Sequence, residues 1–221
     1  MDRQAYGLKW QFDRKILQHV CRVSIWSMFN QFIGVASWFA FFVAVEHLGE
    51  MELAATNVIR SISTLFFVIV NSLAATTGSL VGNLLGAGQK DMVLPLCNRV
   101  IRMGYAVGGP LIILSIVCFN PIFSIYSGNG DLMRTAHLPF VVALLNYVFA
   151  LPGYVYMNAV TGTGATRTTF IFQAATIIAY QIYLWSVSCF STSLSVYWTA
   201  EYLYVILLRV LSVIYLKNKG Y

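Results

Sequence analysis

Residues 61–82 read SISTLFFVIVNSLAATTGSLVG, and no Asp, Glu, Lys or Arg occurs anywhere between Arg60 and Lys90. An α-helix rises 1.5 Å per residue, so about 20 residues cross the roughly 30 Å of hydrocarbon in a bilayer. The stretch lacks the alternation over about 10 residues that a membrane β-strand would show. It therefore predicts a membrane-spanning helix, and this helix decides the fold class.

The rest of the chain repeats the pattern. Of the 221 residues, 58% are hydrophobic and 10% are charged, whereas about 25% are charged in an average soluble domain. We expect an all-α integral membrane protein, in which a bundle of six transmembrane helices occupies residues 23–45, 54–82, 98–119, 138–160, 168–190 and 194–216.

The basic residues predict the orientation of this bundle. An even number of spans places both termini on one side of the membrane, and 12 of the 14 Lys and Arg residues fall on that side. Arg60 and Arg134 lie toward the other side. Because cytoplasmic loops carry the excess of Lys and Arg, we expect a multi-pass protein of the cytoplasmic (inner) membrane with both termini in the cytoplasm. The net charge of +6 is explained by topology and does not indicate binding to nucleic acid.

Several amide side chains lie inside the predicted spans, where they cannot face lipid without a large cost. Two explanations are open for each of them: hydrogen bonds between helices, or contact with a substrate in a wet interior. The residues are Asn30, Gln31, Asn71, Asn146, Gln173 and Gln181.

Two ionisable residues lie deeper than the span ends. Glu201 and Arg60 are each about 10 Å from the outer face by helical rise, and an unpaired charge at that depth is costly. We therefore predict that Arg60 and Glu201 form a charged pair or share a polar network. The alternative is that Arg60 extends its side chain to the surface while Glu201 is protonated.

Motifs of the common enzyme classes are absent from the sequence. It holds no H-E-x-x-H, no phosphate-binding G-x-x-x-x-G-K-[ST] and no G-x-S-x-G. His19, His47 and His137 are far apart, and the four cysteines are scattered singly. We expect no enzymatic activity, no catalytic residue, no metal site and no cofactor, so the movement of a small molecule is favoured over its chemical transformation.

Three sequence runs carry a resemblance to a known family. They are LGEMELAATNV at 48–58, LVGNLLGAGQ at 80–89 and AVTGTGATR at 159–167. The chain resembles the multidrug and toxic-compound extrusion (MATE) transporters, in which an LG…LAA pattern leads into the second helix of a bundle that ends in a VGxxLGAG-type run. A glycine-rich turn between the fourth and fifth helices is also similar.

The resemblance implies one lobe of a transporter that has two such six-helix bundles. The run YGLKWQFD at 6–13 looks like the linker before a second bundle, so the chain is identified as the C-terminal half, either a fragment or a natural half-transporter. We divide it into an interfacial lead-in at residues 1–22, a six-helix bundle at 23–217 and a cytoplasmic tail at 218–221. Its expected partners are membrane lipid, a second six-helix bundle and small organic cations.

The implied activity is cation-coupled multidrug efflux by antiport, which one bundle alone is not expected to perform. Two alternatives are half of a related flippase for lipid-linked sugars and a membrane assembly partner that transports nothing. The expected residues of a substrate cavity are Gln31, Trp38, Asn71, Asn146, Tyr147 and Tyr154.

One departure from the family concerns the coupling ion, Na⁺ or H⁺. Some members bind a cation through acidic residues on the first and fourth helices of this bundle. The corresponding positions here hold Asn30, Gln31 and Gly34, and then Asn146, Tyr147 and Ala150. The chain thus offers no clear cation site there, and coupling falls to the second bundle or to Glu201.

Overall fold

The computed structural model describes residues 14–126, 128–190 and 193–221. These residues form eight α-helices and one short 3-10 helix. In chain order they are α1 (Arg14–Glu46), α2 (Glu50–Gly86), η1 (Lys90–Met92), α3 (Val93–Val117), α4 (Phe119–Tyr126), α5 (Gly130–Leu145), α6 (Tyr147–Gly162), α7 (Thr166–Phe190) and α8 (Leu194–Asn218).

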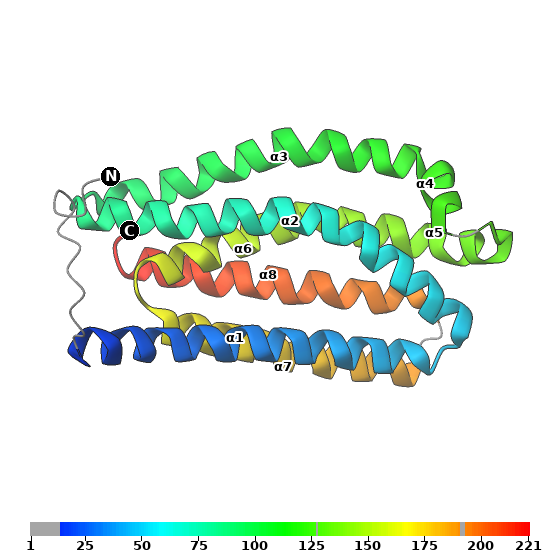
Figure 1. Cartoon of the computed structure of the whole chain (residues 1–221), viewed down its shortest axis with the longest axis horizontal. Coiled ribbons are helices and arrows are strands. Elements are labelled where there is room, and N and C mark those ends of the chain that lie inside the picture. The colour runs from blue at the N-terminus through cyan, green and yellow to red at the C-terminus, as the bar shows by residue number, and fades with distance from the viewer. Residues whose placement is uncertain (1–13, 127, 191–192) are drawn as a thin grey trace.

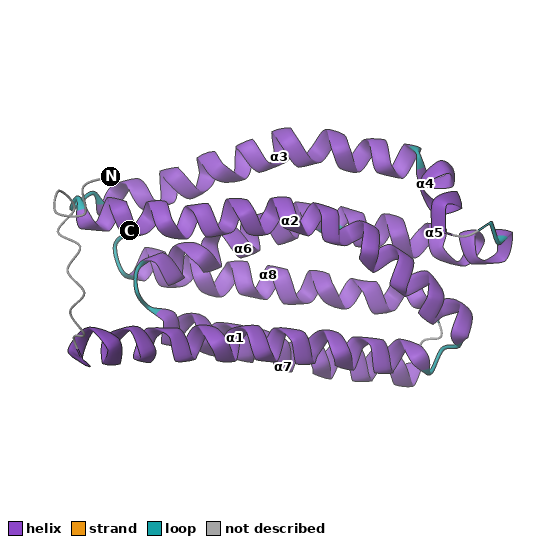
Figure 2. Cartoon of the chain, in the orientation of Figure 1, coloured by secondary structure: helices purple, strands orange, loops and turns teal. Residues whose placement is uncertain are grey.

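Six segments of the described chain are long and apolar enough to cross a membrane, which confirms the predicted all-α fold with six spans. No β-strand is present among the described residues (Figure 2). The segments are Ser24–Glu46, Glu50–Gly86, Lys90–Val117, Gly130–Gly162, Thr166–Phe190 and Leu194–Asn218.

The helices differ from the prediction mainly at their ends. The fourth span consists of α5 and α6, which meet at Asn146, and it begins at Gly130 instead of residue 138. A short helix that the sequence analysis did not expect, α4, precedes it. The buried rings of Phe119 and Phe123 hold α4 against Phe140 of α5, with ring centroids 5.3 and 5.7 Å from the Phe140 ring.

The helices form an elongated bundle in which most neighbours along the chain run in opposite directions (Figure 1). Helix α1 packs chiefly along α7, and α2 packs chiefly along α6, while α8 contacts both α6 and α7. The first turn of α1 and the last turn of α8 lie at the same end of the bundle (Figure 1). The core therefore runs along α6 and α8, and the pair α1 and α7 lies on one side of it.

Two glycines make the tight connections between spans possible. Gly49, between α1 and α2, has φ 139°, and Gly164, between α6 and α7, has φ 84°. A side chain at either position would be strained because L-residues rarely adopt positive φ. Of the predicted lead-in at 1–22, residues 14–22 form the first turns of α1 and the remainder lies outside the described residues. The predicted division at residues 23–217 and 218–221 stays a prediction.

Candidate functional site

An open cavity of about 510 Å³ lies between the pair α1 and α7 and the helices α2, α6 and α8. Amide side chains line it from four helices, where apolar surface would be expected in a bundle that only packs. These residues are Gln31, Asn71, Asn158 and Gln173. A cavity of this size with a few convergent polar groups has the character of a small-molecule site.

A carboxyl group lies in this cavity. Glu201 of α8 is 8% exposed and lines the cavity together with Tyr154, Tyr180 and Tyr204. The Tyr180 hydroxyl lies beside the Glu201 carboxyl group, although the two do not form a hydrogen bond of standard geometry. The ring of Tyr204 lies 6.3 Å from that of Tyr180 and 6.4 Å from that of Tyr154. Glu201 is thus surrounded by aromatic rings and hydroxyl groups from three helices.

Amides of α7 hold α1 at the edge of the cavity. The Gln173 side chain donates a hydrogen bond from Nε2 to the backbone carbonyl of Asn30, over 3.0 Å. About two turns further along α7, Gln181 donates from Nε2 to the Ser37 hydroxyl oxygen, over 3.3 Å. For these two glutamines the structure shows the interhelical hydrogen bonds that the sequence analysis considered beside substrate contact.

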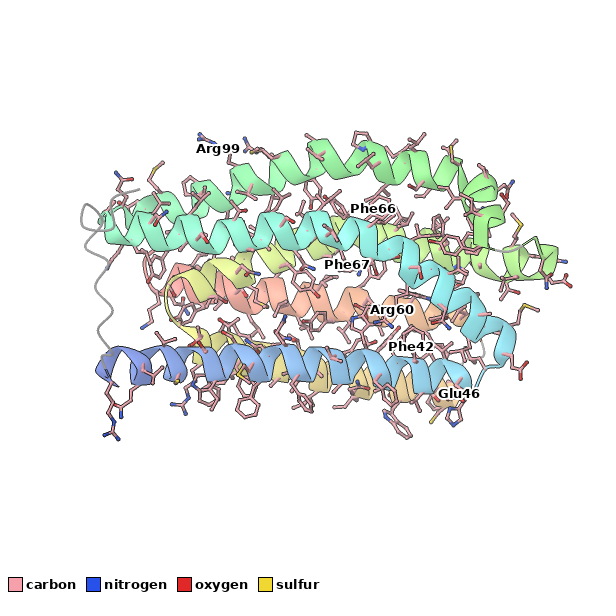
Figure 3. The ribbon with its side chains drawn as sticks, viewed as in Figure 1. Phe42, Glu46, Arg60, Phe66, Phe67 and Arg99 are labelled. Carbon is pink, nitrogen blue, oxygen red and sulfur yellow. The ribbon has the colours of Figure 1, made fainter. Side chains whose placement is uncertain are left out.

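Arg60 and Glu201, which we predicted to form a charged pair or to share a polar network, form no ion pair in the described part of the chain. The Arg60 guanidinium group lies over two aromatic rings of α1, 5.3 Å from the centroid of Trp38 and 5.0 Å from that of Phe42. Figure 3 shows Arg60 reaching from α2 toward Phe42. The cation is stabilised by the ring quadrupoles instead of by a carboxylate. Equal depth along two helices does not fix the direction in which their side chains point.

The structure places four of the six predicted cavity residues together. Gln31, Trp38, Asn71 and Tyr154 all line the cavity, and they come from α1, α2 and α6. Trp38 both lines the cavity and contacts the guanidinium group of Arg60.

Asn146 and Tyr147, the other two predicted cavity residues, lie outside the cavity. Asn146 is 2% exposed at the junction of α5 and α6. The Tyr147 hydroxyl donates a hydrogen bond to the backbone carbonyl of Gly104 on α3, over 2.9 Å. Tyr147 therefore binds to α3, whereas the buried Asn146 side-chain oxygen has no hydrogen-bond partner among the described residues.

The sequence analysis missed the two tyrosines that surround Glu201 besides Tyr154. Tyr204 follows Glu201 by three residues, so both share one face of α8. This spacing could have indicated the site, but Tyr180 comes from another helix and no local pattern marks it. Among the described residues no group of His, Cys, Asp and Glu is arranged to hold a metal ion.

Comparison with known proteins gives a family and two curated relatives. A family model described as MatE matches residues 27–187. An uncharacterized transporter of Schizosaccharomyces pombe is 28% identical over 152 residues, which cover 65% of this chain and 27% of the relative. A Bacillus subtilis protein named as probable multidrug resistance protein YoeA is 23% identical over 138 residues, covering 62% of this chain and 30% of the relative. The matches span less than a third of the length of either relative.

Solved structures share the fold. A crystal structure of MATE in complex with MaL6 superposes with a TM-score of 0.79 at 16% identity, and the match covers 95% of this chain and 48% of that one. An outward-facing multidrug resistance MATE family transporter of the MOP superfamily superposes with a TM-score of 0.70, covering 89% of this chain and 43% of that one. This chain therefore corresponds to about half of each solved transporter.

Proposed function

Because the chain belongs to the MatE family of multidrug and toxic-compound extrusion transporters, we propose that it forms half of a cation-coupled antiporter that exports organic cations. The family model covers residues 27–187, so membership is carried by most of the chain. The chain corresponds to 48% of one solved transporter and 43% of another. Alternating access usually needs one repeat to move against another around a shared site. On this proposal, activity requires a second six-helix bundle.

The observation that carries the proposed substrate class is the cavity around Glu201. Its lining combines one carboxyl group, aromatic faces such as Trp38 and Tyr204, and amides such as Gln31. Ring faces attract organic cations, and a carboxylate neutralises their charge. Among the residues that the structure describes, no Lys or Arg lines this cavity. A site built in this way favours a cation over an anion.

The same lining argues against the flippase alternative. A lipid-linked sugar carries its charge on phosphate groups, which proteins bind with Arg, Lys or backbone N–H groups. The described cavity offers a carboxyl group in that place. An assembly partner without transport would have no need of a polar cavity in its interior, since polar groups inside a membrane are costly.

Glu201 is the proposed site of ion coupling within this chain. A carboxyl group that binds either a proton or the substrate couples the movement of one to the movement of the other, because each displaces the other from the site. The positions on the first and fourth spans at which some family members carry acidic residues hold Asn30, Gly34 and Ala150 here. No carboxylate is therefore present at those positions. We also infer from the distribution of Lys and Arg that the chain lies in the inner membrane with both termini in the cytoplasm.

Reconstitution tests the proposal directly. The chain would be incorporated into proteoliposomes alone, and in parallel together with the N-terminal six-helix half of a MATE transporter. Efflux of a fluorescent organic cation would be driven by a proton or sodium gradient. We expect transport only from the two-bundle sample. Transport by the single chain would overturn the half-transporter assignment, and failure of the chain to bind the cation at all would overturn the substrate class.

A further inference from the structure

A second groove lies on the other side of the core, between α3 and α8. It has a volume of about 620 Å³, and α6, which contacts both helices, forms its floor through Phe149 and Tyr156. None of its lining residues lines the cavity around Glu201. Tyr154 and Asn158 face that cavity from a different face of α6. The groove is therefore separate from the proposed transport site.

The groove is polar and positive in one part. Arg209 and Lys217, both from α8, line it, as does Asn98 of α3. The Tyr156 hydroxyl donates a hydrogen bond to Asn98 Oδ1, over 2.8 Å. These four residues line the groove in the half of the bundle at which α8 terminates, and we call them the basic cluster.

The two cations of the basic cluster have no acidic partner in the described part of the chain. Asp91 of η1 lies at the same end of the bundle, but it forms no ion pair with either of them. Glu201 lines the other cavity. Arg209 precedes the end of α8 by nine residues, which is about 14 Å of helical rise. A cation at that depth in a membrane needs either an anion or a route to the headgroups.

Beside the basic cluster, the remaining walls of the groove are apolar. Val210, Val213 and Ile214 line it from α8, Leu94 lines it from α3, and Phe149 lies on its floor. A ligand that fits both parts must carry an anionic group joined to a hydrocarbon chain. The lipid matrix itself supplies such a molecule. Basic pockets between transmembrane helices are known to bind phospholipid headgroups.

We propose that this groove binds one anionic phospholipid from the leaflet at the end where α8 terminates. Its phosphate accepts hydrogen bonds from Arg209 and Lys217, because guanidinium and ammonium groups are strong donors to phosphate oxygens. Its acyl chain lies along Val210, Val213 and Ile214. The inference does not depend on transport, because the lipid would bind the single chain.

Native mass spectrometry of the full chain in detergent tests this proposal. Phosphatidylglycerol and phosphatidylcholine with identical acyl chains would be added in equal amounts. We expect the chain to retain phosphatidylglycerol preferentially, and the variants Arg209→Gln and Lys217→Gln each to weaken that binding about tenfold, as expected for loss of a charged hydrogen bond. Equal retention of the two lipids by the unmodified chain would overturn the proposal.

Matched variants separate a site from general charge. Lys219→Gln removes a cation one residue beyond the end of α8, and Arg134→Gln removes one from α5, and neither residue lines the groove. Both variants should bind phosphatidylglycerol as the unmodified chain does. An equal loss in these controls would show a nonspecific surface effect and would sink the proposal.

The acyl chain has its own test. Glycerol 3-phosphate, which has the phosphate without the hydrocarbon, should not displace phosphatidylglycerol at the same concentration. Ile214→Trp should narrow the groove and weaken lipid binding while Arg209 and Lys217 stay in place. Full displacement by glycerol 3-phosphate, or unchanged binding by Ile214→Trp, would contradict a lipid site.

Discussion

The Tyr105 hydroxyl on α3 donates a hydrogen bond to the backbone carbonyl of Val148 on α6, over 2.6 Å. Val148 precedes Pro152 by four residues, and Pro152 lies inside α6. Proline has no N–H group, so the Val148 carbonyl cannot receive its usual helical hydrogen bond. Tyr105 supplies the missing donor from the neighbouring helix, as bilayer helices with internal proline require.

This relationship predicts that Tyr105→Phe lowers the free energy of unfolding by about 1 kcal/mol. In a Pro152→Ala background the alanine N–H group satisfies the Val148 carbonyl, so the same substitution should cost less. Unfolding by SDS titration, followed by tryptophan fluorescence, would measure both. Tyr126→Phe is the control, because Tyr126 lies half exposed at the end of α4. Identical costs in the two backgrounds would contradict the explanation.

The close approach of α2 and α6 gives a second prediction. A Cβ atom added at Gly162 would overlap the backbone of Gly78, whereas one added at Gly86 would meet nothing within 4 Å. Gly162→Ala must therefore push the two helices apart, and we expect it to destabilise the bundle by roughly 1–3 kcal/mol. Gly86→Ala should be neutral or slightly stabilising, since alanine is the better helix former. Thermal unfolding of the two variants in the same detergent checks this, and equal stability would show that the contact is dispensable.

Glu201 gives a third prediction, for substrate binding. Glu201→Gln keeps the shape of the side chain but removes the negative charge from the cavity. We expect the affinity for a monovalent organic cation to fall about tenfold or more, which corresponds to about 1.4 kcal/mol. Titration of the purified chain, monitored by the fluorescence of Trp38 and the other tryptophans, would measure the change. Glu46→Gln, at the exposed end of α1, should leave the affinity unchanged. Equal affinities in both variants would remove Glu201 from the proposed site.

The fold could be predicted from the sequence because the length of the uncharged apolar runs governs it. An uncharged apolar run must match the thickness of hydrocarbon, and six runs do so. The helix ends were less predictable, since α2 and α3 continue through polar residues outside that thickness. Helix α4 was missed because it is too short to span and is held by contacts of Phe119 and Phe123 that only the tertiary structure supplies.

The candidate site was predictable only in part, for a geometric reason. Helical rise gives the depth of a side chain, but the direction it faces depends on which helices pack beside it. Gln31 and Asn71 face the cavity. Tyr147 instead lies against α3, where the missing side chains of Gly104 and Gly108 leave room for its ring. The sequence did not indicate Tyr180 as a site residue, because a neutral tyrosine in an apolar helix gives no local signal.

The contact of Arg60 with α1 gives the last prediction, and a double-mutant cycle decides it. If Arg60 is stabilised by the ring of Trp38, then Arg60→Gln and Trp38→Leu should show a coupling energy of about 0.5–1 kcal/mol in unfolding experiments. The cycle of Arg60→Gln with Glu201→Gln should give a coupling close to zero, since these two residues form no ion pair. A large coupling between Arg60 and Glu201, together with none between Arg60 and Trp38, would restore the ion pair that equal depth suggested. The cycle with Phe42→Leu serves as an internal check, because Phe42 lies 5.0 Å from the same guanidinium group and should couple to Arg60 with the same sign as Trp38.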